Sequence, residues 1–188
     1  MPTEPLPAAA DDDISDGPPR AVLIAAVAIA VVAIGAVLAI AATRHTPTQP
    51  VAIASVPAPQ SDSADCRTLV NDLPDRLGDV SRAPAVEPVP AGAAAWRAEP
   101  DGDAVILRCG IDRPAEFVVG SPIQMVDQVQ WFRLDDPAAD RSTWVTVDRP
   151  VYVALTLPSG SGPSPIQTVS DLIARTLPQV AIRPGAAS

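Results

Sequence analysis

Residues 151–177, VYVALTLPSGSGPSPIQTVSDLIARTL, contain a strand pattern and a helix pattern joined by a short loop. In residues 151–157 every second side chain is apolar, which predicts a strand with one buried face. Pro150 indicates a break or a sheet edge before that strand. After the loop, apolar side chains recur at the spacing of one helical face. These side chains are Ile166, Val169, Leu172, Ile173 and Leu177.

The ends of this second helix are also readable. Ser164, Pro165 at the first helical position and Gln167 predict a capping box, in which side chains bind the N–H groups left unpaired at a helix start. Pro178 ends the helix because proline has no N–H group for a further turn.

Earlier segments predict more strands and a first helix. Residues 104–109 alternate, with Val105, Leu107 and Cys109 on one face and Ile106 and Arg108 on the other. Residues 126–134 and 144–148 are further predicted strands. Helical spacing also relates Cys66, Leu69, Val70, Leu73 and Leu77.

The sequence also predicts where that first helix begins and ends. Ser63 or Asp65 is its expected cap, Pro74 ends or kinks it, and Gly78 stops it. A helix, several strands and a second helix indicate the α+β class, with a small antiparallel sheet packed against two helices.

Residues 21–42 form an apolar run of Ala, Val, Leu and Ile plus one Gly, with Arg20 and Arg44 outside it. A helix of this length spans about 33 Å, enough to cross a hydrocarbon core of about 30 Å. The run therefore predicts a transmembrane helix. The sequence before it is acidic, which favours an uncleaved anchor, although Ala39-Ile40-Ala41 leaves a cleaved signal peptide open.

The cysteines decide the expected orientation, because one arginine on each side of the run leaves the positive-inside rule undecided. Cys66 and Cys109 both follow the run and lie on the inward faces of their predicted elements. We therefore expect a disulfide between them, and hence a domain outside the cytoplasm. Two buried free thiols are the alternative.

Besides the transmembrane helix over residues 21–42, the expected organisation has four parts. Residues 1–20 are predicted to be a disordered acidic cytoplasmic tail, and residues 43–62 a Pro-rich linker. Residues 63–180 are the predicted extracytoplasmic α+β domain, and residues 181–188 a flexible C-terminal tail. The net charge of −9 argues against nucleic acid as a partner.

The sequence offers few groups for catalysis, and no catalytic residue, metal ligand set or cofactor is predicted. There is no lysine, and His45, beside the membrane, is the single histidine. This argues against nucleophile–histidine catalysis and against zinc. The remaining candidates are the carboxylates of Asp101 and Asp103, and of Asp135, Asp136 and Asp140. Each group could act as an acid–base pair, bind calcium, or simply mark a solvated turn between strands. Arg113 and Trp131 are the candidates for a ligand surface.

The chain resembles the domain-of-unknown-function family 3515, found in actinobacterial envelope proteins. The residues that carry this resemblance are Cys66 with Leu69, Leu73-Pro74 and Leu77, then Trp96, Leu107-Arg108-Cys109-Gly110, Arg113-Pro114, Val126 through Trp131-Phe132, and Arg149 to Val153. The resemblance implies an exported domain with paired cysteines and implies no activity.

These observations favour a single-pass membrane protein whose outer domain is a binding or structural module, with an envelope protein or a cell-wall component as partner. The alternative is a carboxylate-dependent envelope enzyme of glycosidase type. A weaker third hypothesis is association through the span, where Gly35 and Ala39 form a pair of small residues.

Overall fold

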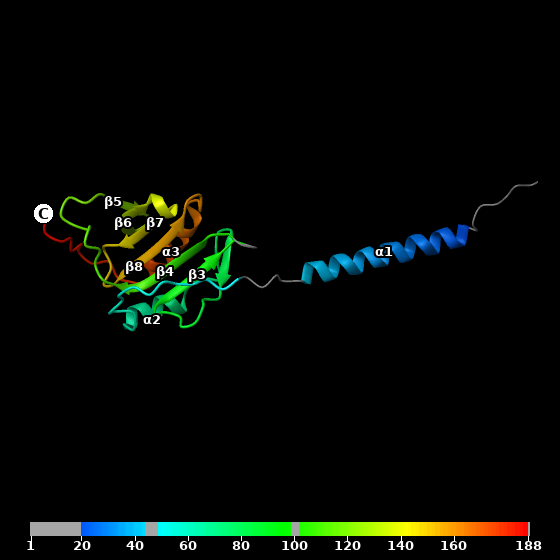
Figure 1. The fold of residues 1–188 in the computed structure, drawn as a ribbon, viewed down its shortest axis with the longest axis horizontal. Coiled ribbons are helices and arrows are strands. Elements are labelled where there is room, and N and C mark those ends of the chain that lie inside the picture. The colour runs from blue at the N-terminus through cyan, green and yellow to red at the C-terminus, as the bar shows by residue number, and fades with distance from the viewer. Residues whose placement is uncertain (1–19, 44–48, 99–101, 188) are drawn as a thin grey trace, which may run out of the picture. The chain divides into compact units, whose positions relative to one another are not determined.

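The computed structural model describes residues 20–43, 49–98 and 102–187, shown in Figure 1. The chain divides into two compact units, Met1–Thr46 and Pro47–Ser188. The expected acidic tail lies almost wholly outside the described residues.

The first unit contains the helix α1, Arg20–Thr43. Its segment Arg20–Ala39 has a mean hydropathy of 3.0, and none of that segment is buried. The helix is long and apolar enough to cross a membrane, and a signal sequence near an N-terminus would have the same properties. The predicted apolar helix is therefore present.

The second unit is α+β, as predicted. Its described residues form one antiparallel sheet of eight strands in the order β1-β2-β3-β4-β8-β7-β6-β5. The strands are β1 Arg76–Leu77, β2 Val80–Ala83, β3 Ala93–Arg97, β4 Ala104–Ile111, β5 Ile123–Val126, β6 Val129–Asp136, β7 Arg141–Thr146 and β8 Tyr152–Pro158. The helices are α2 Ala64–Asn71 and α3 Ser164–Thr176, and a short 3₁₀ turn, η1, spans Pro137–Ala139.

Both helices pack on one face of the sheet and enclose the main core. The alternation predicted for β4 and β8 is confirmed, because Val105, Leu107 and Cys109 join this core together with every second residue of β8. Trp96 of β3 and Trp131 of β6 are fully buried there. The apolar stripe of α3 joins the same core, and the Trp131 indole N–H donates to the Ser170 hydroxyl of this helix.

The opposite face of the sheet is partly covered by a segment that we expected to be linker. Val51 is only 2% exposed, and Ile53 packs beside it against Ala95 and Ile106. The Val51 N–H donates to the Pro84 carbonyl oxygen at 2.8 Å. Residues 49–56 therefore belong to the folded unit, and the Pro-rich composition concealed a short extended piece with apolar residues two positions apart.

The expected C-terminal tail is also docked over its described part. The Gly185 N–H donates to the Phe117 carbonyl oxygen at 2.8 Å, and the Val119 N–H donates back to Gly185 at 3.0 Å. These two bonds hold the chain after α3 against the loop between β4 and β5.

Three details of the predicted elements are wrong. The first helix ends at Asn71, and Leu77 enters the core from β1 instead. The strand predicted over residues 126–134 begins only at Val129, as β6, because the chain turns at Asp127, which has a φ of 53°, and Val126 ends the preceding strand β5 of the same hairpin. The capping box at Ser164 is absent, because Pro163 occupies the cap position and no side chain caps the helix.

Candidate functional site

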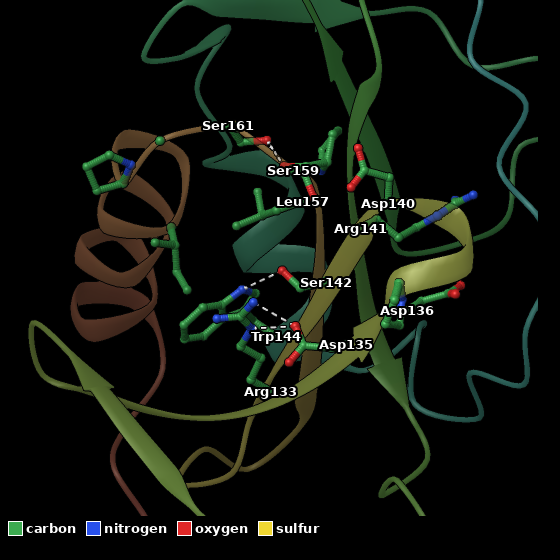
Figure 2. A pocket seen from close by; sticks show the side chains of 16 residues that line it. Arg133, Asp135, Asp136, Asp140, Arg141, Ser142, Trp144, Leu157, Ser159 and Ser161 are labelled. Carbon is green, nitrogen blue, oxygen red and sulfur yellow. Dashed lines mark hydrogen bonds and ion pairs between the residues drawn. The ribbon is translucent and has the colours of Figure 1, made fainter.

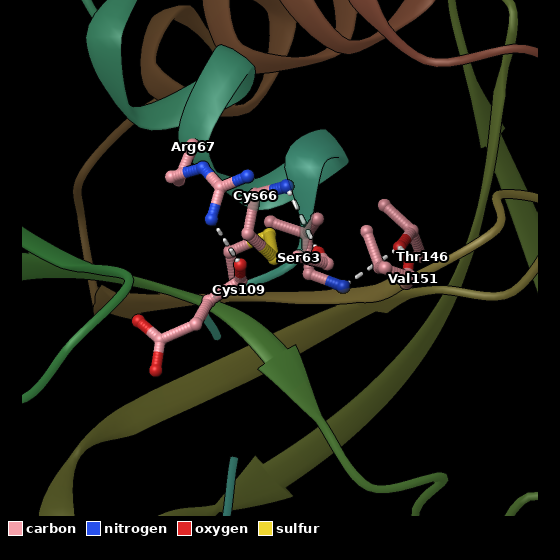
Figure 3. The surroundings of a disulfide bond; sticks show 8 residues. Ser63, Cys66, Arg67, Cys109, Thr146 and Val151 are labelled. Carbon is pink, nitrogen blue, oxygen red and sulfur yellow. Dashed lines mark hydrogen bonds between the residues drawn. A yellow bond between two sulfur atoms is a disulfide. The ribbon is translucent and has the colours of Figure 1, made fainter. Parts of the chain in front are cut away.

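The disulfide joins the helix layer to the centre of the sheet (Figure 3). Cys66 of α2 and Cys109 of β4 are bonded, with their Cα atoms 5.5 Å apart and both side chains fully buried. Ser63 caps α2 as expected, since its hydroxyl accepts the Cys66 N–H at 3.2 Å. The pairing predicted from the two inward-facing cysteines is confirmed.

The glycine after the second cysteine permits a close contact between two backbones. Gly110 has a φ of +82°, and a Cβ atom there would lie 2.3 Å from the carbonyl carbon of Gln60. The Gln60 N–H donates to the Gly110 carbonyl oxygen at 3.1 Å. Only glycine allows this approach, which accounts for the sequence Arg-Cys-Gly at this point in β4.

A pocket of about 740 Å³ lies where β7, η1 and the loop from β8 to α3 meet. We call it the β7–α3 pocket; Figure 2 shows its lining side chains. Its lining includes the apolar side chains of Trp144 and Ile166 together with carboxylates and serine hydroxyls. The labelled polar residues are Arg133, Asp135, Asp136, Asp140, Arg141, Ser142, Ser159 and Ser161.

Trp144 is held in position by two neighbours. Its indole N–H donates to the Ser142 hydroxyl at 3.1 Å, and the Arg133 guanidinium lies 5.3 Å from its ring centroid. Arg133 in turn pairs with Asp135, with 2.6 Å between Nη2 and Oδ1. The tryptophan ring is thus fixed while remaining only partly buried.

The carboxylates predicted as candidate acids divide between two places. Asp135, Asp136 and Asp140 all line the β7–α3 pocket, whereas Asp103 lines a neighbouring cavity with Asp140. Asp136 is engaged in capping η1, since its Oδ1 accepts the Ala139 N–H at 3.2 Å. Asp101 lies outside the described residues.

All three pocket carboxylates are exposed to solvent. A general acid of the glycosidase type is usually kept protonated by apolar surroundings, which these positions do not provide. Among the described residues, no group of three or more potential ligands is placed to hold a metal ion.

The two residues predicted as a ligand surface lie elsewhere. Trp131 is fully buried, and its indole N–H donates to the Ser170 hydroxyl of α3 at 3.0 Å, so it presents no surface to a ligand. Arg113 is exposed, and its Nη1 donates to the Phe117 carbonyl oxygen at 2.7 Å. The structure does not bring the two residues into one site.

Sequence reasoning missed a buried ion pair in the turn between β7 and β8. Asp148 and Arg149 are both buried, with 2.8 Å between Oδ2 and Nη1. Asp148 Oδ1 accepts the Gln130 N–H at 3.1 Å, and Arg149 Nη2 donates to the Gln128 carbonyl oxygen at 2.8 Å. The pair fixes the β5–β6 hairpin and acts structurally.

The comparison with protein families identifies the chain. The family described as "Protein of unknown function (DUF3515)" matches residues 27–182, which is most of the chain, and the protein belongs to it. No curated protein and no solved structure shows significant similarity to the chain.

Proposed function

We propose that this protein is a single-pass membrane protein whose folded unit lies outside the cytoplasm and binds a hydroxyl-rich saccharide of the cell envelope in the β7–α3 pocket, without acting as an enzyme. The observation that carries the proposal is the fixed, partly exposed ring of Trp144 beside carboxylates and serine hydroxyls in a pocket of about 740 Å³.

The size and chemistry of the pocket support binding. Ligand pockets commonly enclose about 300–1,000 Å³ and combine an apolar wall with a few placed polar groups. A sugar ring has an apolar C–H face that can rest on an indole ring, and its hydroxyl groups donate to carboxylates such as Asp135 and Asp140. Ser159 and Ser161 add hydroxyl groups to the lining.

The location rests on α1 and the disulfide. An apolar helix of this length fits a membrane anchor. A buried disulfide in the folded unit fits an oxidising compartment. A reporter that is active only outside the cytoplasm, fused after Ser188, should therefore be active, and the mature protein should retain Met1. A soluble product that begins near Thr43 would show instead that α1 is a cleaved signal.

Ligand binding can be tested on the full chain in detergent micelles. A tetrasaccharide of N-acetylglucosamine is titrated while tryptophan fluorescence is recorded, since Trp144 is the partly exposed indole of the pocket. Trp144→Leu should abolish binding, whereas Asp171→Asn, an exposed carboxylate on α3, should not change it. Equal affinity in wild type and Trp144→Leu would rule out the proposed site.

The same samples discriminate the enzyme alternative. Release of new reducing ends from the tetrasaccharide, lost in Asp140→Asn, would show that the pocket hydrolyses its ligand. Binding without such release supports a binding module.

A further inference from the structure

A second, smaller cavity adjoins the β7–α3 pocket at one end of the sheet. It encloses about 260 Å³, and we call it the strand-end cavity. Asp140, Arg141 and Pro158 line both cavities. The strand-end cavity is also lined by Arg97 of β3, Asp103 just before β4, and Thr156 of β8.

Strand alternation places the two cavities on opposite faces of the sheet. Ser142 and Trp144 of β7 point to the face that the helices cover, where Trp144 packs against the main core. Arg141, one residue before Ser142, points to the other face. Figure 2 shows its side chain running away from Trp144. A ligand that occupies both cavities therefore passes around the end of β7 at Asp140.

The backbone between the two cavities is short and held by hydrogen bonds. Asp140 follows η1 with a φ of 49°, and its N–H donates to the Pro137 carbonyl oxygen at 3.4 Å. The Ser159 N–H donates to the Asp140 carbonyl oxygen at 2.9 Å. Both bonds use the backbone of Asp140. Its carboxylate, which lines both cavities, can therefore accept hydrogen bonds from a ligand that passes between them.

The charges of the strand-end cavity favour a neutral ligand. Its ionised side chains are two guanidinium groups, Arg97 and Arg141, and two carboxylates, Asp103 and Asp140. None of the four forms an ion pair with another described residue. An anion would be repelled by the carboxylates and a cation by the guanidinium groups. Hydroxyl groups can instead donate to the carboxylates and accept from the guanidinium groups.

We propose that the strand-end cavity is a second subsite for the saccharide of the β7–α3 pocket, so that the ligand is an extended, uncharged oligosaccharide. This inference rests on the proposed function, because it takes the class of ligand from the larger cavity. Trp144 supplies the indole on which one sugar ring rests, and the strand-end cavity supplies donors and acceptors for a ring further along the chain. Val51 and Ile106 provide the apolar wall that ligand pockets commonly have.

The test compares two lengths of N-acetylglucosamine oligosaccharide by calorimetric titration of the full chain in detergent micelles. The disaccharide is short enough to occupy the β7–α3 pocket alone, whereas the hexasaccharide can enter both cavities. We expect the hexasaccharide to bind about tenfold more tightly or better, because the second cavity adds hydrogen bonds to ionised groups. Trp144→Leu should abolish the binding of both ligands.

Asp103→Ala tests the second cavity separately, since Asp103 is exposed and lines the strand-end cavity. This variant should lose most of the gain in affinity with chain length and should bind the disaccharide as wild type does. The matched control is Asp112→Ala, which removes an exposed carboxylate from a separate cavity. The control should bind both ligands as wild type does.

The outcomes distinguish this inference from the proposed function. If both lengths bind with equal affinity, or if Asp103→Ala keeps the full gain, the second subsite is overturned while the saccharide pocket stands. The subsite is also overturned if Asp112→Ala loses the gain as Asp103→Ala does, because the effect would then be one of general charge. If neither ligand binds to wild type at about 10 mM, both proposals are overturned.

Discussion

Gly110→Ala should be among the most destabilising single substitutions in the folded unit. The added methyl group would lie 2.3 Å from two backbone atoms, the carbonyl carbon of Gln60 and the amide nitrogen of Ser61. Neither atom can move aside as a flexible side chain would. The backbone of residues 60–61 must therefore withdraw from β4, next to the disulfide.

The expected cost has two parts. A left-handed backbone angle costs a residue with a Cβ atom about 1–2 kcal/mol. Withdrawal also breaks the Gln60–Gly110 hydrogen bond, worth about 1 kcal/mol, and loosens the packing around it. We expect a total of about 3 kcal/mol or more once the loosened packing is included, a large share of the stability of a typical domain.

The matched control is Gly120→Ala. Gly120 has a φ of +91°, but a Cβ atom there would meet nothing within 4 Å, so this variant carries only the backbone strain of about 1–2 kcal/mol. Urea unfolding of both variants, followed by the fluorescence of buried Trp96 and Trp131, measures the difference. Equal losses in the two variants would refute the steric argument.

Three further changes test other contacts. Replacing Cys66 and Cys109 together by Ala should lower the free energy of unfolding by roughly 4 kcal/mol, as the sequence separation of 43 implies. This loss should be much less than twice the loss caused by replacing one cysteine, because both replacements remove the same bond. Additive losses in a denaturation experiment would contradict a shared bond. Asp148→Asn should cost about 3 kcal/mol because the buried guanidinium loses its counterion, and adding Arg149→Met should recover part of that loss in the same assay. A chain that begins at residue 57 should melt at a lower temperature than one that begins at residue 47, because the 49–56 segment buries two aliphatic side chains worth about 1.5–3 kcal/mol each. Identical melting curves would show that this segment contributes nothing to stability.

The elements that the sequence predicted well carry strong periodicity. In β4 and β8, alternating apolar residues identified the core face, and both cysteines were placed on inward faces because each sits within such a pattern. In the first helix, Leu77 fits the helical spacing but enters the same core from β1. Spacing shows that a residue is buried, and here Pro74 determined which element buries it.

Other parts of the fold have no periodic signal. Most of β3 is Ala93, Ala94 and Ala95, small residues that look alike on both faces, and β1 and β2 are too short to show a pattern. Trp131 was a candidate for a ligand surface, yet it and its neighbour Phe132 are both buried, because Phe117 covers the second face of β6. When a loop distant in the sequence buries one face of a strand, the sequence of the strand alone does not predict that burial.

The candidate site was predictable only in part. The carboxylates of residues 135–140 were recognised as a cluster, and three of them do line one pocket. Trp144 was not among the predicted candidates, because nothing in the local sequence distinguishes a half-buried tryptophan from a core one.

Residues 49–66 form the N-terminal part of the folded unit and are attached to the rest of it at three points. Val51 is bonded to the segment after β2, Gln60 to Gly110, and Cys66 covalently to Cys109 in the central strand β4. Val51 makes two backbone hydrogen bonds and Gln60 makes one to Gly110, and contacts of this kind open readily at a chain end. The disulfide limits how far this opening can spread, because residues beyond Cys66 remain joined to the centre of the sheet. The disulfide therefore protects the core against unfolding that starts at the N-terminal side of the folded unit.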